Sequence, residues 1–140
     1  MTESNLNLVI VDDDEHDYEF LSHILQGFDF PFKKTWLKDG EEVIDYLEKF
    51  EPFGDQVPCK NVFLMDVNLP KVNGLELVKI IKNHPVAKDD FVIMLSGSKT
   101  KGDKESAEKN GCDCYLVKPF GDQEIKEFSK FLSLKLSSLI

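Results

Sequence analysis

The sequence is poor in cysteine, has no apolar run long enough to cross a membrane, and carries fewer basic than acidic residues. Its three cysteines, Cys59, Cys112 and Cys114, are an odd number without the CxxC spacing of a metal site, which favours a reducing cytoplasm. No signal peptide pattern is present, so we expect neither secretion nor membrane insertion. The net charge of −9 argues against nucleic-acid binding, because phosphates require a basic face.

Apolar segments with strand character alternate with amphipathic helical patterns along the chain. With 41% hydrophobic and 31% charged residues, the 140 residues are typical of one folded domain with its own core. The expected strands cover residues 6–11, 34–39, 61–65, 91–95 and 112–117. The expected helices cover residues 15–26, 41–50, 74–84, 104–110 and 122–140.

This alternation predicts an α/β fold, a doubly wound five-stranded parallel sheet with helices on both faces. We expect the flavodoxin-like strand order 2-1-3-4-5 and a single domain over residues 1–140, with no output domain. Cys112 and Cys114 are two residues apart, so they would share one face of the fifth strand, where packing is the simplest role.

Acidic side chains end or follow two of the expected strands. The segment MDVNLP places Asp66 at the end of the third strand, and Asp12 and Asp13 follow the first. A carboxylate at a strand end can simply begin a turn, but in this strand order the first and third strands are neighbours and ligands bind at their carboxyl ends. The three carboxylates should therefore converge, and their repulsion requires a positive partner. Mg²⁺ and Lys118 are the candidates, with the Ser96 hydroxyl on the same rim.

Four motifs, each at a strand end, carry a family resemblance. LVIVDDDEHD, FLMDVNLPKVNG, VIMLSGS and YLVKPF resemble, in this order, the receiver domains of two-component response regulators across nearly the whole chain. The resemblance implies that Asp66 accepts a phosphoryl group from a histidine of a partner kinase and forms an acyl phosphate. It also implies a Mg²⁺ site made by Asp13, Asp66 and the backbone carbonyl of Asn68, with Asp12 acting mainly through metal-bound water.

The same resemblance assigns roles to residues near the fourth and fifth strands. Lys118 would contact the phosphoryl oxygens, and Ser96 would be drawn towards them. Tyr115 would be an aromatic switch that moves inward with Ser96, and Pro119 would follow a cis peptide bond. From the residues alone, Tyr115 has a second interpretation, as a strand aromatic that packs on a neighbour.

Asp14 extends the acidic run and has two interpretations. It could form the metal pair with Asp13, or it could cap the helix that begins at Glu15. The cap is favoured because aspartate is among the best N-cap residues and because Glu15 and Asp17 suit the first turn of a helix.

The resemblance implies a sensor histidine kinase as the phosphoryl donor and an unidentified downstream protein as the target of the signal. The loop 51–60 is longer than in minimal receivers and resembles that of receivers serving phytochrome-type or hybrid kinases. The expected last helix is apolar on more than one side, because Phe131 and Leu134 lie off the stripe that would face the sheet. This pattern predicts a homodimer, either through this helix or through the face of the fourth and fifth strands, or else a tail folded back on its own domain.

Two other functions fit the pattern less well. A Mg²⁺-dependent phosphatase with an aspartyl-phosphate intermediate would need a second acid two residues after its nucleophile, where this sequence has Asn68. A flavodoxin-like cofactor binder would need a phosphate-binding loop after the first strand, where DDDEHD is acidic. We therefore expect a stand-alone signalling receiver rather than an enzyme, in which phosphorylation changes protein contacts or is passed on to another protein.

Overall fold

The computed structural model of the chain describes residues 6–49, 60–97 and 101–139. Five strands and five helices alternate along these residues, with one short 3₁₀ helix, η1 (Ala87–Asp89). The strands are β1 (Leu6–Val11), β2 (Lys33–Leu37), β3 (Lys60–Asp66), β4 (Phe91–Ser96) and β5 (Cys114–Val117). The helices are α1 (Glu15–Gln26), α2 (Gly40–Glu48), α3 (Gly74–Lys82), α4 (Lys101–Lys109) and α5 (Asp122–Ser137). The predictions for Cys59 and for the loop 51–60, apart from Lys60, lie outside the described residues.

The five strands form one parallel sheet in the order β2-β1-β3-β4-β5, which confirms the predicted topology. β1 pairs with β2 on one side and with β3 on the other, so the strand order reverses between β1 and β3. Val11 stands opposite Met65, and Asp66 stands opposite Leu95 of β4. The chain therefore leaves β1 and β3 side by side at the same edge of the sheet.

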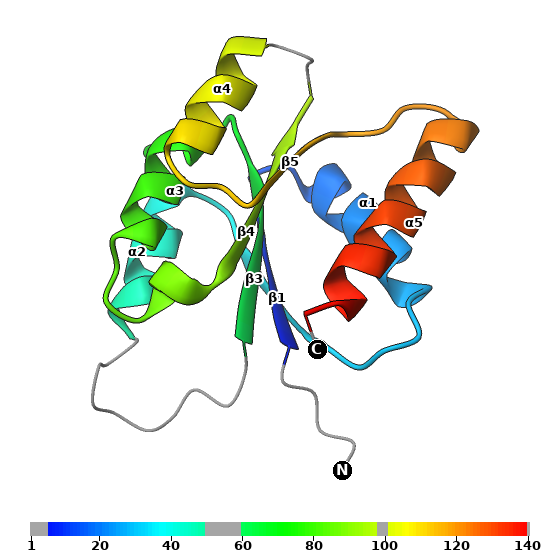
Figure 1. The fold of residues 1–140 in the computed structure, drawn as a ribbon, viewed down its shortest axis with the longest axis horizontal. Helices are drawn as coiled ribbons and strands as arrows, with labels where there is room; N and C mark the ends of the chain where they lie inside the picture. The colour runs from blue at the N-terminus through cyan, green and yellow to red at the C-terminus, as the bar shows by residue number, and fades with distance from the viewer. Residues whose placement is uncertain (1–5, 50–59, 98–100, 140) are drawn as a thin grey trace.

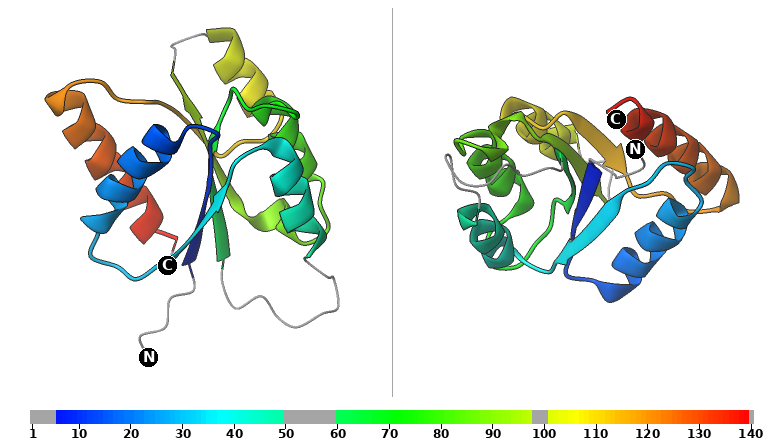
Figure 2. Two further views of the ribbon diagram at one scale, coloured as in Figure 1. Left: turned by 180° about the vertical axis from the view of Figure 1, so that it is seen from behind. Right: turned by 90° about the horizontal axis from the view of Figure 1, so that it is seen from below.

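The helices cover both faces of the sheet, α2, α3 and α4 on one face and α1 and α5 on the other (Figures 1 and 2). Alternate residues of a strand point to opposite faces. In β1, Val9 and Val11 pack in the core under α2–α4, while Leu8 and Ile10 pack in the core under α1 and α5. Because the central strands are buried on both faces, their sequences are nearly continuous apolar runs.

Polar side chains begin the first three helices. Asp14 caps α1, because its carboxylate accepts a hydrogen bond from the His16 N–H at 2.8 Å. Asp39 and Asn73 cap α2 and α3 in the same way. These caps satisfy N–H groups that have no partner within the helix. The cap interpretation of Asp14 is confirmed.

Some element boundaries differ from the prediction, and one difference changes how the cysteines pack. Gly111, at φ 107°, turns the chain, and β5 begins only at Cys114. Cys112 thus precedes the strand, and the prediction that it shares a face with Cys114 is wrong, because strand alternation does not extend to it. Cys112 packs in the core under α2–α4 and Cys114 in the core under α1 and α5. Burial raises the pKa of the Cys112 thiol to about 11, so the thiol is protonated at neutral pH.

α5 presents one apolar stripe to the sheet, as predicted. Phe128, Leu132 and Leu136 are buried in the core that α5 shares with α1. Phe131 and Leu134 lie off this stripe and are 43% and 63% exposed. The homodimer and the folded-back tail both stay predictions. None of the described helices, of which α5 with 16 residues is the longest, is long and apolar enough to cross a membrane.

Candidate functional site

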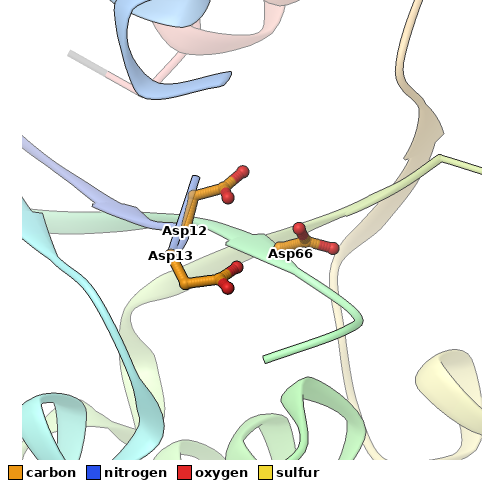
Figure 3. A group of neighbouring side chains, drawn as sticks. All are labelled: Asp12, Asp13 and Asp66. Carbon is orange, nitrogen blue, oxygen red and sulfur yellow. The ribbon is translucent and has the colours of Figure 1, made fainter. Parts of the chain in front are cut away.

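Three carboxylates meet at the carboxyl edge of the sheet, where β1 and β3 are neighbours. Asp12 and Asp13 follow β1, and Asp66 is the last residue of β3. One oxygen atom from each side chain lies within 4.8 Å of the others, and the Asp12 and Asp13 carboxylates extend towards Asp66 (Figure 3). Asp12 and Asp66 are only 1% and 9% exposed, whereas Asp13 is open to solvent. The structure thus brings together the carboxylates that the strand order predicts to converge.

Main-chain contacts fix the direction of the two buried carboxylates. Asp12 Oδ1 accepts a hydrogen bond from the Asp14 N–H at 2.9 Å, and Asp66 Oδ1 accepts one from the Asn68 N–H at 3.0 Å. The Trp36 indole N–H donates to the backbone carbonyl of Asp12 at 2.9 Å, which ties β2 to this loop. The second oxygen, Oδ2, of Asp12 and of Asp66 contacts Lys118.

Lys118 brings a positive charge to this group from the end of β5. Its Nζ atom lies 3.1 Å from Asp12 Oδ2, 3.0 Å from Asp66 Oδ2 and 2.8 Å from Asp17 Oδ2. The Lys118 main-chain N–H donates to the Ser96 carbonyl at 2.7 Å, which fixes where the side chain begins. Burial alone would lower the pKa of Lys118, but the hydrogen bonds to Asp17 and Asp66 and the nearby negative charges raise the pKa above its ordinary value. Lys118 is therefore charged at neutral pH.

The chemistry of this donor set fits a divalent cation. Burial raises the pKa of Asp12, and the negative charge of Asp66 adds to this effect, while the Asp14 N–H and Lys118 oppose it. One ammonium group does not balance three carboxylates, so a further cation would relieve their repulsion. Carboxylate oxygens at a partly solvated edge are the hard ligands that Mg²⁺ takes.

Ser96 and Tyr115 belong to the face of the sheet that α2–α4 cover. Ser96 ends β4 and is fully buried. Tyr115 pairs with Met94, which lies two residues before Ser96 and therefore points to the same face as Ser96. Tyr115 packs against the core under α2–α4, as a strand aromatic is expected to do. Its role as a switch, like the phosphoryl contact of Ser96, stays a prediction.

The Tyr115 hydroxyl is buried and has no hydrogen-bond partner among the described residues. Because a buried polar group without a partner is destabilising, we expect Tyr115→Phe to raise the free energy of unfolding by about 1 kcal/mol, measured by urea denaturation. Tyr46→Phe is the matched control, since the Tyr46 hydroxyl accepts from Asn7 at 2.9 Å and donates to Asn61 at 3.0 Å. The control should lose stability. A similar loss in Tyr115→Phe would refute the account of the buried hydroxyl.

Gly74, the first residue of α3, passes so close to Asp66 that no side chain fits. A Cβ atom at Gly74 would overlap the backbone oxygen of Asp66, and the Gly74 N–H donates to the Val67 carbonyl at 3.0 Å. We expect Gly74→Ala to lower the free energy of unfolding by about 1–3 kcal/mol, measured by thermal and urea denaturation. Gly27→Ala is the control, because Gly27 has φ −83° and its Cβ would meet only an ordinary contact at 3.5 Å. Equal losses in both variants would argue against this tight packing.

The segment between β5 and α5 leads from the sheet across to the start of α5 (Figure 1). The described residues contain no cis peptide bond, so the cis bond expected before Pro119 is wrong in this structure. Trans is the more stable isomer of an X–Pro bond unless the surroundings select cis. Gly121, at φ 85°, adopts the left-handed conformation that favours glycine and turns the chain into α5.

Asp17 is the charged side chain of this site that sequence reasoning does not find. The sequence places Asp17 in the first turn of a helix, where a negative charge is favourable in any case. The signal that could find it is strand alternation. Leu116 packs in the core under α1 and α5, so Lys118, two residues later, points to the face that α1 covers.

Comparison with known proteins identifies the family. The family model of the response regulator receiver domain matches residues 8–130 of this chain. The chain belongs to the response regulator receiver family. The probable methanogenesis regulatory protein FilR2 of Methanothrix harundinacea is 29% identical over 119 residues, which are 85% of this chain and 76% of that protein. The polar-differentiation response regulator DivK of Brucella ovis is 29% identical over 113 residues, 81% of this chain and 84% of that protein.

Solved structures show the same receiver fold. The Mn²⁺-bound form of the response regulator Rcp1 superimposes with a TM-score of 0.76 over 91% of each chain, at 22% identity. Five parallel strands in the order 2-1-3-4-5 with five helices are common to this fold. As a receiver, the chain is a domain of two-component signalling, and its acidic group is compatible with a divalent metal.

Proposed function

We propose that this receiver accepts a phosphoryl group on Asp66 from a sensor histidine kinase. The observation that carries the proposal is the position of Asp66 at the end of β3, with Asp12, Asp13 and Lys118 around it. A carboxylate is the nucleophile that this group offers. A kinase that takes its phosphoryl group from ATP would phosphorylate this receiver in the cytoplasm. The phosphorylated form would change contacts with a downstream protein or pass the group on to another protein.

The phosphoryl transfer forms one bond and breaks one bond. An Asp66 oxygen attacks the phosphorus atom, the bond from phosphorus to the histidine nitrogen breaks, and the kinase imidazole leaves with the bonding electrons. Such a transfer depends on positioning and on charge stabilisation more than on acid or base chemistry. Lys118 donates to the phosphoryl oxygens from one side, where its Nζ already lies 3.0 Å from Asp66.

Asp13, Asp66 and the backbone carbonyl of Asn68 would hold Mg²⁺, with Asp12 contributing through bound water. Bound there, the cation would offset the negative charge of the acceptor and of the transferred oxygens. After the transfer, the acyl phosphate offers new acceptor oxygens to Ser96 and Lys118. This difference in contacts can bias a two-state rearrangement in which Tyr115 follows Ser96.

Transfer of a single phosphoryl group, rather than turnover, is the outcome that this site supports. Asn68 occupies the position at which a phosphatase of this chemistry places a second acid, and an amide does not act as a general acid or base at neutral pH. Incubation with acetyl phosphate and Mg²⁺ should add one phosphoryl group per chain, measured by intact-protein mass spectrometry. Repeated turnover of a phosphate monoester would favour the phosphatase, and a chain that neither takes up a phosphoryl group nor turns over a monoester would contradict both functions.

A further inference from the structure

Lys118 has a third carboxylate partner that does not belong to the acidic group. An ammonium group has three N–H donors, and here they reach Asp12, Asp66 and Asp17. The contact with Asp17 is the shortest of the three, at 2.8 Å against 3.1 Å and 3.0 Å. Only Asp12 and Asp66 offer oxygens to the group that could hold a metal, together with Asp13.

The fold explains why Asp17 reaches Lys118. Asp17 lies in the first turn of α1, three residues after the Asp14 cap, and α1 covers the sheet face to which Lys118 points. Beside this ion pair lies a mostly apolar cavity of about 480 Å³, lined by side chains of α1 and α5 that include Phe20, Leu21 and Phe128. The Lys118 side chain is only 18% exposed and lines this cavity together with Asp17.

The three contacts of Lys118 would respond differently to phosphorylation. In the function proposed above, an oxygen of Asp66 becomes part of the acyl phosphate, and one N–H of Lys118 turns to a phosphoryl oxygen. Asp12 would at the same time contribute to the metal site. Asp17 takes no part in either change, so its contact with Lys118 can persist throughout the transfer.

We propose that Asp17 is a positioning residue that holds the Lys118 ammonium beside Asp66 before and after phosphoryl transfer. The proposal rests on the phosphoacceptor function of this same site. A free lysine side chain has many conformations, and fixing it in advance lowers the cost of placing its charge on the phosphoryl oxygens. Asp17 also adds a negative charge near an anionic donor, which alone would slow the transfer. If Asp17 positions Lys118, removing the Asp17 side chain should slow phosphoryl transfer. If Asp17 only repels the anionic donor, removing it should speed the transfer.

Two variants of Asp17 separate its hydrogen bond from its charge. Asp17→Ala removes both, while Asp17→Asn keeps a carbonyl oxygen that can accept from Lys118. Glu19→Ala is the matched control, because it removes the same charge from an exposed position of α1. We expect Asp17→Ala to lower the rate constant of phosphorylation by acetyl phosphate about three- to tenfold. The Asp17→Asn variant should retain at least half of the wild-type rate, and Glu19→Ala should match the wild type.

A second readout does not depend on phosphorylation. The ¹⁵N signal of the Lys118 ammonium, recorded by NMR without metal, should be sharp in the wild type and in Asp17→Asn and lost to rapid exchange in Asp17→Ala. The affinity for Mg²⁺, followed by Trp36 emission, should change less than twofold in Asp17→Ala.

Four outcomes are decisive. A rate in Asp17→Ala at or above that of the wild type, or an unchanged Lys118 signal, would overturn the proposal. A fall in Mg²⁺ affinity large enough to explain the slower rate would also overturn it, because Asp17 would then act on the metal. If the wild type takes up no phosphoryl group, the proposed function fails, and the Lys118 signal still decides whether Asp17 positions the lysine.

Discussion

We expect the Asp66→Asn variant to take up no phosphoryl group from acetyl phosphate under conditions in which the wild type takes up one. An amide is not a nucleophile at neutral pH, so the bond to phosphorus cannot form. Asp12 and Asp13 both follow β1, whereas Asp66 ends β3, so neither carboxylate would occupy the position of the Asp66 oxygen. Intact-protein mass spectrometry measures the result directly, and the expected loss is complete.

The Asp66→Asn variant should still fold. Its side-chain oxygen can accept the hydrogen bond that Asp66 receives from the Asn68 N–H, and one like charge beside Asp12 is removed. Asp14→Asn is the matched control, since asparagine caps a helix as well as aspartate does. This control removes the same net charge, but from the acidic run after β1, and should be labelled like the wild type. Equal labelling of Asp66→Asn and wild type would show that another residue is the acceptor.

The second large effect concerns Asp13, the exposed member of the acidic group. We expect Asp13→Asn to weaken Mg²⁺ binding about tenfold or more, because the charge of the ligands sets the affinity of a site for a hard cation. Without metal, the same variant should be more stable than the wild type by up to about 1 kcal/mol, because unit charges this close repel by that amount even in water. Without metal, the repulsion between the carboxylates of this site thus lowers the free energy of unfolding.

Trp36 provides the measurement for Asp13→Asn. It is the only tryptophan of the chain, and its indole N–H donates to the carbonyl of Asp12 at 2.9 Å. Its emission should therefore respond to Mg²⁺, and a titration gives the affinity of each variant, while urea denaturation in EDTA gives the stability. Asp14→Asn again serves as the control. An unchanged affinity in Asp13→Asn would remove Asp13 from the metal site.

Strand ends explain why much of this site could be predicted from the sequence. A parallel sheet brings the carboxyl ends of its strands to one edge, so the order of strands alone places Asp12 and Asp13 beside Asp66. Lys118 and Ser96 follow by the same argument, since each stands at a strand end on that edge. The backbone geometry of the fold, rather than the packing of individual side chains, therefore determines which of these residues lie close together.

What could not be predicted depends on packing and on local turns. Strand alternation gives the sheet face to which Lys118 points, but its contact with Asp17 also needs the rotation of α1 on the sheet, which a helical pattern does not give. The opposite directions of Cys112 and Cys114 follow from the turn at Gly111, which shortens β5. The buried Tyr115 hydroxyl is also a packing result, because the strand pattern gives the face of a residue but not the partners of its polar atoms.

The most direct test of the phosphoacceptor site is to identify the phosphorylated residue of the wild type with and without Mg²⁺. After incubation with acetyl phosphate, borohydride reduction marks the acyl phosphate, and peptide mass mapping finds its position. We expect one modified residue, Asp66, and only in the sample that contains Mg²⁺. A modification at Asp12 or Asp13, or equal modification of Asp66 in the presence of EDTA, would contradict the account.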